Sequence, residues 1–252
     1  MTDGPEPEGP WSLQFGLAEA TELLTGGTLE ILGRIPWASN VTLLARACDQ
    51  DGERSGAVIY KPQRGERPLW DFPTGLYRRE LAAFLVSQAL GWDLVPLTVV
   101  RDGPLGVGSV QLFVEAEDDV TAFDLVASQH PAMLAVAAFD VVVNNADRKG
   151  GHTLLGPDGH VWAIDHGVCF HAEPKLRTVV WDYAGQPVPD ELLEDLRRLG
   201  AELDGGRGPA PELGTLLEPA EVVAIGRRAA GLVERGVYPA PDGDRPYPWP
   251  LV

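Results

Sequence analysis

Two stretches near the middle of the chain, NADRKGGH (residues 145–152) and WAIDHG (residues 162–167), decide the fold that we expect. Asp147 lies in the first stretch, and Asp165 follows eighteen residues later in the second. The residues between them predict a strand at 152–155, a Pro/Gly turn and a strand at 161–164, so both carboxylates should lie at the same end of one hairpin. Two carboxylates placed this way suit phosphoryl transfer: one accepts the proton of an attacking hydroxyl and the other holds a divalent metal.

A lysine and a glutamate further upstream add to this pattern. The run GAVIYKP (residues 56–62) places Lys61 at the end of a β-branched strand, and Glu80 follows nineteen residues later. Residues 76–90 have apolar side chains at helical spacing, with Gly91 as a C-cap, so Glu80 should lie at the edge of the buried face. We therefore expect Lys61 and Glu80 to pair, although either one alone could be a solvated surface charge.

In this order the motifs resemble the protein-kinase-like superfamily, and within it the phosphatidylinositol 3-/4-kinase-like branch. YKP resembles the lysine strand, while Asp147-Arg148 and Asp165-x-Gly167 match the D-R and D-x-G of the catalytic and metal motifs. The resemblance covers roughly residues 28 to 200. It implies an α+β, two-lobed protein-kinase-like fold, with an antiparallel-sheet N-lobe and a reduced helical C-lobe.

The resemblance also implies roles for particular side chains. Lys61, held by Glu80, would position the α- and β-phosphates of ATP, and Asp165 would bind Mg²⁺ or Mn²⁺. Asp147 would orient the acceptor hydroxyl, with Lys149 beside it to meet the developing phosphoryl charge.

One position departs from the pattern. His152 lies five residues after Asp147, where the resemblance leads us to expect a metal-binding Asn. Imidazole can bind a divalent metal but prefers softer ions than Mg²⁺. His152 therefore indicates Mn²⁺ use, a single-metal site or reduced activity.

Two further segments are candidates for nucleotide contacts. The turn at Ser39-Asn40, between two expected strands, could contact the phosphates through its backbone N–H groups and the Ser39 hydroxyl, although an ordinary hairpin fits it equally well. The strand expected at 108–116 ends at Glu115-Ala116, where the backbone could bind adenine. Phe113, on the same strand, could line the base pocket, although a place in the core is expected because strand aromatics mostly pack.

The pattern along the chain predicts a disordered N-terminus at 1–10, an N-lobe at 11–116, a C-lobe at 117–237 and a Pro-rich tail at 238–252. Helices are expected at 11–24, 131–145, 190–203 and 218–236, with a loop at 204–214. The tail should be extended, either docked by Tyr247 and Trp249 or free.

Composition is that of an ordinary folded protein: 252 residues, 44% hydrophobic and 23% charged. The acidic, Pro-rich N-terminus is unlike a signal peptide and no apolar run reaches the roughly 20 residues of a membrane span, so we expect a cytoplasmic protein. Its cysteines, Cys48 and Cys169, should be free thiols. The sequence contains neither a G-x-S-x-G elbow nor a Cys/His array with zinc spacing.

The net charge of −17 bears on the partners. Such a surface should repel nucleic acid and anionic membranes, so neither is expected as a partner. Three basic residues near the motifs, Lys149, Lys175 and Arg177, could nevertheless meet an anionic substrate.

The expected function is that of an ATP-dependent kinase whose partners are ATP and an unidentified acceptor, either a protein or a small molecule. Protein hydroxyls, small metabolites and inositol head groups remain open as acceptors. Two alternatives keep the same fold: a pseudokinase that binds nucleotide without catalysis, for which His152 would be the mark, and a nucleotidyl transferase.

Overall fold

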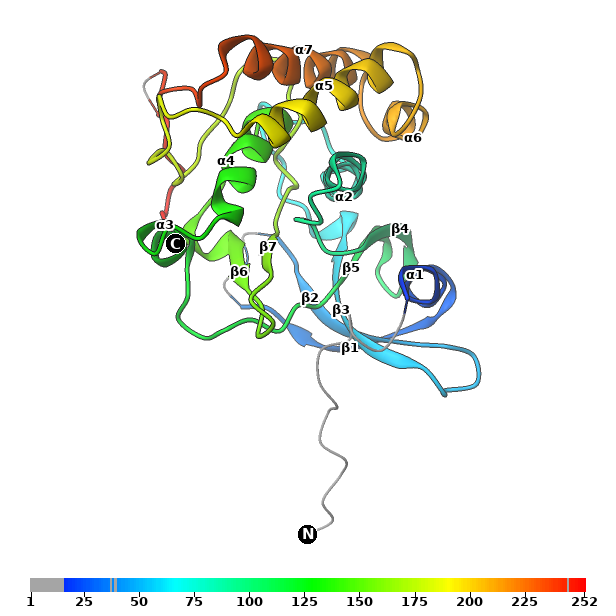
Figure 1. Cartoon of the computed structure of the whole chain (residues 1–252). Coiled ribbons are helices and arrows are strands. Elements are labelled where there is room, and N and C mark those ends of the chain that lie inside the picture. The colour runs from blue at the N-terminus through cyan, green and yellow to red at the C-terminus, as the bar shows by residue number, and fades with distance from the viewer. Residues whose placement is uncertain (1–15, 37, 39, 244) are drawn as a thin grey trace.

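The protein is described from a computed structural model, which places residues 16–36, 38, 40–243 and 245–252. It has the expected α+β architecture, with a sheet in one lobe and mainly helices in the other (Figure 1). The segment 1–10, expected to be disordered, lies outside the described residues. None of the described helices is long and apolar enough to cross a membrane.

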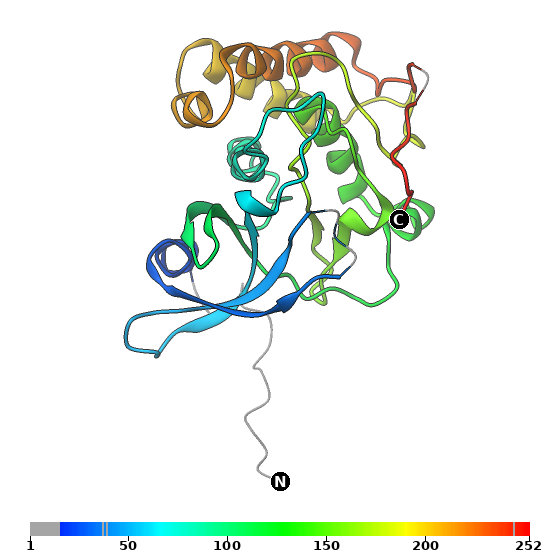
Figure 2. The ribbon, with the colours of Figure 1, turned by 180° about the vertical axis from the view of Figure 1, so that it is seen from behind.

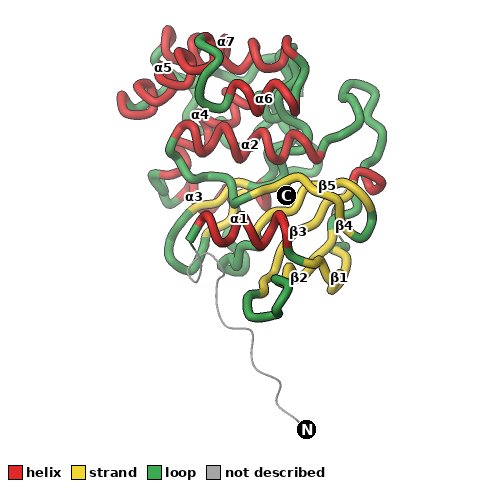
Figure 3. The backbone as a smooth tube through the Cα atoms, turned by 90° about the vertical axis from the view of Figure 1, so that its right-hand side faces the viewer, coloured by secondary structure: helices red, strands yellow, loops and turns green. Residues whose placement is uncertain are grey.

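The N-lobe is built on a five-stranded antiparallel sheet with strand order β1-β2-β3-β5-β4. Its strands are β1 (Thr28–Arg34), β2 (Leu43–Cys48), β3 (Ser55–Pro62), β4 (Thr98–Gly103) and β5 (Gly106–Leu112). Alternate residues of β3 are buried, including Val58 and Tyr60, so Lys61 points to the opposite face. The helix α1 (Leu17–Gly26) packs against β4 (Figure 3).

The helix α2 (Tyr77–Leu90) carries Glu80 and contacts both lobes. It ends at Gly91, whose φ of 72° is the left-handed conformation of a C-cap, as expected. Besides β4 and β5, it contacts α5 (Asp190–Asp204) and α6 (Ala210–Leu216) of the C-lobe. This helix is therefore held by both lobes.

The C-lobe contains five α-helices and the hairpin that carries the two acidic motifs. Its elements, besides α5 and α6, are α3 (Ala122–Ala127), α4 (Ala132–Val143), η3 (Gly150–His152), β6 (Thr153–Leu155), β7 (Val161–Ala163) and α7 (Pro219–Arg235). A short helix η2 (Gln63–Gly65) follows β3 in the N-lobe. The strands β6 and β7 pair antiparallel, with Thr153 opposite Ala163, which confirms the expected hairpin.

Several boundaries differ from those expected. The first described helix begins at Leu17 rather than Trp11, with residues 11–15 outside the described part, and β5 ends at Leu112 rather than 116. The loop expected at 204–214 was wrong, because α6 begins there after Pro209. Proline at a helix N-terminus is favourable, and the fully buried Leu213 supplies the packing that stabilises so short a helix.

The Pro-rich tail is docked on the C-lobe, beside α3 and β6 (Figure 2). The Pro246 carbonyl accepts a hydrogen bond from the Thr178 N–H at 3.1 Å, and the Leu251 carbonyl accepts one from Gly150 at 2.7 Å. Tyr247 and Trp249 are 50% and 87% exposed, so the tail is neither docked by these side chains nor free, which were the two alternatives expected. Backbone carbonyls anchor it instead.

Candidate active site

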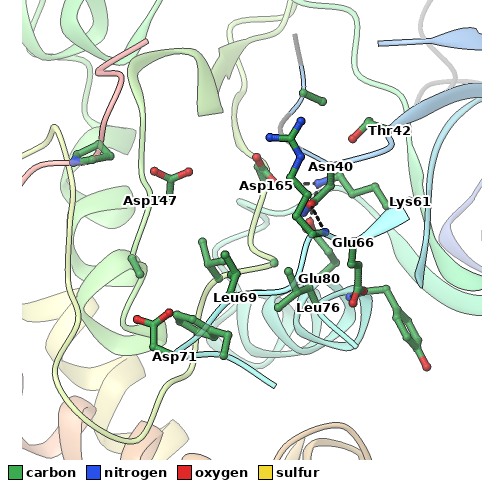
Figure 4. A pocket seen from close by; sticks show the side chains of 18 of the residues that line it. Asn40, Thr42, Lys61, Glu66, Leu69, Asp71, Leu76, Glu80, Asp147 and Asp165 are labelled. Atoms are coloured by element: carbon green, nitrogen blue, oxygen red, sulfur yellow. Dashed lines mark hydrogen bonds and ion pairs between the residues drawn. The ribbon is translucent and has the colours of Figure 1, made fainter. Parts of the chain in front are cut away.

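Lys61 joins the sheet to both neighbouring elements of the site. Its Nζ lies 2.5 Å from Oε1 of Glu80 and 3.0 Å from Oδ1 of Asp165, which confirms the expected pairing with Glu80 (Figure 4). The other oxygen of Glu80 accepts a hydrogen bond from the His166 N–H at 3.0 Å. Glu80 therefore fixes both the lysine and the backbone of the second acidic motif.

These contacts set the charges of the pair. Burial lowers the pKa of Lys61, but the carboxylates of Asp165 and Glu80 outweigh this and raise it above its usual value. Burial likewise raises the pKa of Asp165, but the positive charge of Lys61 holds it well below its usual range. Lys61 is therefore a cation and Asp165 a carboxylate at neutral pH.

The backbone around Asp165 is unusual. Asp165 has φ of 61° and Phe170 has φ of 69°, a region that non-glycine residues seldom adopt. This segment is hydrogen-bonded to the end of α4 and to the loop that follows it, from Ala146 N–H to Val168 O at 3.1 Å and from Phe170 N–H to Val143 O at 2.6 Å. The surrounding structure thus holds Asp165 in a conformation that would otherwise be unfavourable.

Asp147 lies on the loop after α4, and the side chain of Asn145 supports that loop. The Oδ1 atom of Asn145 accepts a hydrogen bond from the Asp147 N–H at 2.9 Å, while its Nδ2 donates to Asp140 at 3.0 Å. The Asp147 carboxylate is 30% exposed and lies 3.1 Å from Nζ of Lys149. Burial raises the pKa of Asp147 above its usual value, although the Lys149 charge opposes this shift.

A buried network beneath the two loops was not expected from the sequence. Arg148 and Asp140 are both fully buried and form an ion pair at 2.9 Å. Arg148 also donates to the carbonyls of His152 and Ile164, at 2.8 and 3.0 Å, and contacts His166 Nε2 at 2.8 Å. The sequence feature that could have indicated this network is Asp140, a lone acid within the apolar helix AMLAVAAFDVVV. A carboxylate buried in such a helix needs a cationic partner.

His152 lies beside Asp165 and completes a pair of candidate metal ligands. Burial lowers the pKa of His152 to about 4, so the ring is neutral at pH 7. Its Nδ1 is 3.0 Å from the Asp147 carbonyl, which can only accept a hydrogen bond, so the lone pair lies on Nε2. That lone pair faces Oδ2 of Asp165 at 3.3 Å.

Two hydrogen-bond acceptors that face each other suit a shared cation. Among the described residues no three His, Cys, Asp or Glu side chains cluster as a complete metal site. Mg²⁺ and similar ions commonly take only one or two protein ligands and complete their coordination with phosphate oxygens and water. Asp165 and His152 therefore fit a metal that binds together with a nucleotide.

The four expected acidic and basic groups Lys61, Glu80, Asp147 and Asp165 line one pocket of about 550 Å³. Figure 4 shows Asp147 on the opposite side of this pocket from Lys61. Asn40 also lines it, and its Oδ1 accepts a hydrogen bond from the Arg67 N–H at 2.9 Å. The expected contact from Ser39 lies outside the described residues.

Glu115 and Ala116 lie in the linker between β5 and α3 and are not among the residues lining this pocket. The linker is fastened at both ends, by Phe113 N–H to Ala57 O at 3.1 Å and by Glu117 N–H to Leu155 O at 2.8 Å. Residues 114–116 form no backbone hydrogen bond with any described residue. Phe113 is 38% exposed, so the expectation that it would be a core residue was wrong.

The elements follow one another in the order that the resemblance implies. The strand with Lys61 comes first, then the helix with Glu80 and the linker, and last the loops with Asp147 and Asp165. The chain thus has a protein-kinase-like fold. Two solved structures are similar: the Helicobacter pylori proinflammatory kinase CtkA, at TM-score 0.48 and 12% identity over 85% of this chain and 94% of that one, and hydra Fam20 with sugar, at TM-score 0.49 and 13% identity over 90% of both.

No family model matches the chain. It is 29% identical over 106 residues to phosphatidylinositol 4-kinase gamma 3 of Arabidopsis thaliana, covering 39% of this chain and 18% of that protein. It is 27% identical over 196 residues to phosphatidylinositol 4-kinase gamma 4 of rice, covering 62% of this chain and 34% of that protein. It is 43% identical over 265 residues to protein Rv2133c of Mycobacterium tuberculosis, covering 90% of this chain and 94% of that protein. The chain therefore belongs to the same family as Rv2133c.

Proposed function

We propose that the protein is an ATP-dependent phosphotransferase that transfers the γ-phosphate of ATP to a hydroxyl acceptor. The observation that carries this proposal is the contact of Lys61 with both Glu80 and Asp165, in a pocket that Asp147 lines from the other side. A strand lysine held by a helix glutamate is the arrangement that positions the α- and β-phosphates in kinases.

The nucleotide half of the site would be formed by the sheet and the linker. Lys61 would bind the α- and β-phosphates, and the turn that contains Ser39 and Asn40 would lie over them. The unpaired backbone groups of Glu115 and Ala116 would bind the base. Asp165 and His152 would hold Mg²⁺ or Mn²⁺, which supplies positive charge to the phosphate oxygens when bound.

The acceptor half would be formed by the catalytic loop. The acceptor oxygen would form a bond to the γ-phosphorus as the bond from that phosphorus to the β,γ-bridging oxygen breaks, leaving ADP. The hydroxyl proton would pass to the Asp147 carboxylate. The raised pKa of Asp147 favours this transfer, and Lys149 holds the carboxylate in place at 3.1 Å.

We further propose that the protein belongs to the phosphatidylinositol 3-/4-kinase-like branch of the superfamily. The partial similarity to two plant phosphatidylinositol 4-kinases supports this placement. The motifs support it as well, because Asp147-Arg148 lacks a preceding His-Arg and His166 stands in the middle of the D-x-G motif.

Nucleotide binding can be tested by thermal unfolding. ATP with Mg²⁺ or Mn²⁺ should raise the melting temperature, because a ligand that binds only the folded state stabilises it. Asp165→Ala should lose most of this shift, whereas Asp51→Ala, at an exposed turn, should keep it. If saturating ATP with either metal leaves the wild-type melting curve unchanged, the proposal is wrong.

Transfer itself can be tested with labelled ATP. Asp147→Asn should leave nucleotide affinity within a few-fold but lower transfer or hydrolysis of the γ-phosphate by at least about 10². Transfer of an α-label instead would show a nucleotidyl transferase. Wild-type protein that binds ATP, yet shows no turnover above the Asp147→Asn background, would be a pseudokinase.

A further inference from the structure

The pocket of this acidic chain contains three arginines that the described residues leave without an ionic partner: Arg67, which follows η2 in the N-lobe, and two more on the side of Asp147. Arg177 and Arg245 both line it, and neither forms an ion pair with any described residue. Two lysines nearby are, by contrast, already engaged: Lys149 with Asp147 at 3.1 Å and Lys175 with Asp71 at 3.0 Å. On the Asp147 side of the pocket, Arg177 and Arg245 are thus the basic groups that remain available for a ligand.

The backbone places Arg177 directly beside the catalytic loop. Its N–H donates to the Asn145 carbonyl at 2.8 Å, and its own carbonyl accepts from the Arg148 N–H at 3.0 Å. Arg177 therefore lies alongside the segment that carries Asp147, and its positive charge acts to lower the pKa of that carboxyl. A ligand bound to Arg177 would be adjacent to Asp147.

The docked tail brings Arg245 to the same pocket. The next residue, Pro246, accepts hydrogen bonds from the Thr178 N–H at 3.1 Å and from Nε1 of Trp181 at 3.0 Å. Thr178 directly follows Arg177 in the chain. The two arginines are thus held on neighbouring segments, although Arg177 and Arg245 are 68 positions apart in sequence.

We infer that Arg177 and Arg245 form an anion-binding subsite, which holds a phosphate or carboxylate group of the acceptor while its hydroxyl lies at Asp147. The term acceptor here rests on the proposed phosphotransferase function. Guanidinium groups bind phosphate and carboxylate through two parallel hydrogen bonds, so a pair of arginines can both bind the anion and fix its orientation.

The mouth of the pocket indicates that this anion belongs to a larger organic molecule. Trp70 and Trp249 both line the pocket and are 92% and 87% exposed, and Tyr247 beside them is 50% exposed. Large aromatic side chains left in water at a pocket can pack against a ring of a bound ligand. A phosphorylated or carboxylated sugar is therefore a suitable class of probe.

The test measures binding, so it does not require turnover. The chain is first saturated with β,γ-imido-ATP and Mg²⁺ to fill the nucleotide side, and its melting temperature is then followed with inorganic phosphate, glucose 6-phosphate, glucuronate or uncharged glucose. At least one anion should stabilise the wild type, and glucose should not. A preference for glucose 6-phosphate or for glucuronate would decide between phosphate and carboxylate.

Variants locate the site. The Arg177→Gln/Arg245→Gln double variant should lose at least about tenfold in anion affinity, and Arg245→Gln alone should lose part of this, which isolates the tail's contribution. Arg197→Gln removes the same charge from the exposed face of α5 and should bind like the wild type. Because both arginines are at least partly exposed, these changes should leave the fold intact.

Two results would overturn the inference: no anion-dependent shift in the wild type, or equal anion affinity in the double variant and Arg197→Gln. The proposed function fails separately, when the nucleotide analogue and ATP themselves give no shift. Anion binding that depends on the two arginines in a chain that does not bind nucleotide would retain the subsite and reject the kinase.

Discussion

The nucleotide side and the acceptor side of the pocket differ in how their charges are satisfied. On the nucleotide side Lys61 is paired with Glu80 and Asp165, and Arg79, the neighbour of Glu80 on α2, is paired with Glu221 of α7 at 2.7 Å. On the acceptor side Arg177 and Arg245 have no ionic partner among the described residues. Folding itself thus pairs Lys61 and Arg79, whereas Arg177 and Arg245 keep positive charge for a ligand.

Burial explains the difference. Glu80 and Arg79 are 3% exposed, and a buried charge without a partner is strongly unfavourable, so the fold must supply partners for them. Arg177 and Arg245 keep contact with solvent and need none. Substitutions should therefore lower stability on the nucleotide side and beneath the loops, and lower binding on the acceptor side.

The largest effect is expected for Arg148→Met, which leaves the fully buried Asp140 without its cation. Breaking a buried ion pair by removing one partner costs about 3–5 kcal/mol in the free energy of unfolding. Arg148 also donates to two carbonyls that would lose their hydrogen bonds. Urea unfolding measures this loss.

The matched control for this variant is Arg46→Met. Arg46 pairs with Glu30 at 3.8 Å, with both side chains more than half exposed, so its loss should cost under about 1 kcal/mol. If the two variants were destabilised equally, the buried network would not be what holds the catalytic and metal loops together.

A smaller effect is expected for Glu221→Gln, which keeps the shape of the side chain but removes its charge. The hydrogen bond from Arg79 to Glu221 ties α2 to α7, and hydrogen bonds to charged groups contribute about 1.5–3 kcal/mol. Arg177→Gln removes a charge from the acceptor side and should change the unfolding free energy by less than about 0.5 kcal/mol. Equal losses in urea unfolding would remove the distinction between the two sides.

The sequence was sufficient for the Lys61–Glu80 pair because its signals are local. A β-branched run that ends in Lys61, a helical apolar pattern around Glu80 and a hairpin before Asp165 each predict an element and its direction. Together they predicted the Lys61–Glu80 contact that the structure shows. They could not predict that α2 also packs on the C-lobe, because Arg79 and Glu221 are 142 residues apart and no local pattern connects them.

The contribution of Arg245 to the acceptor side could not be predicted for the same reason. Arg245 is held at the pocket because the neighbouring Pro246 carbonyl accepts hydrogen bonds from Thr178 and Trp181. These donors lie more than 60 positions away in sequence, and no periodic pattern in the sequence predicts such contacts. The sequence identified Lys149, Lys175 and Arg177 as candidate anion contacts, but only the structure shows that both lysines are already paired. The structure also shows that His166 contacts Arg148 and so belongs to the buried network beneath the loops.

A metal test examines the nucleotide side more finely. Asp165 offers a metal ion an oxygen ligand, and His152 offers it a nitrogen ligand. Because imidazole prefers softer ions than Mg²⁺, Mn²⁺ should saturate the nucleotide-bound wild type at a lower concentration than Mg²⁺. His152→Asn replaces the nitrogen with an amide and should shift this preference towards Mg²⁺ by about tenfold, or about 1.4 kcal/mol. The midpoint of the melting-temperature rise with each metal, in the presence of β,γ-imido-ATP, measures it.

His160→Asn is the control for the metal test. His160 also contacts a backbone carbonyl, that of Asp93 at 2.8 Å, but it lies on the turn between β6 and β7 and, unlike His152, does not contact Asp165. The His160→Asn variant should therefore have the same metal preference as the wild type. An unchanged preference in His152→Asn would show that His152 only supports the loop and that Asp165 holds the metal without it.

A small effect is also expected for Trp181→Phe, which removes one of the tail's anchors. The Pro246 carbonyl would lose the Nε1–H donor but keep its bond from Thr178, so the unfolding free energy should fall by only about 0.5–1.5 kcal/mol. Anion affinity should fall a few-fold because Arg245 is held less firmly, while nucleotide affinity should not change. Trp162→Phe, whose indole nitrogen has no hydrogen-bond partner among the described residues, controls for the smaller ring. A fall in nucleotide affinity equal to that in anion affinity would show that the tail supports the whole pocket rather than its acceptor side.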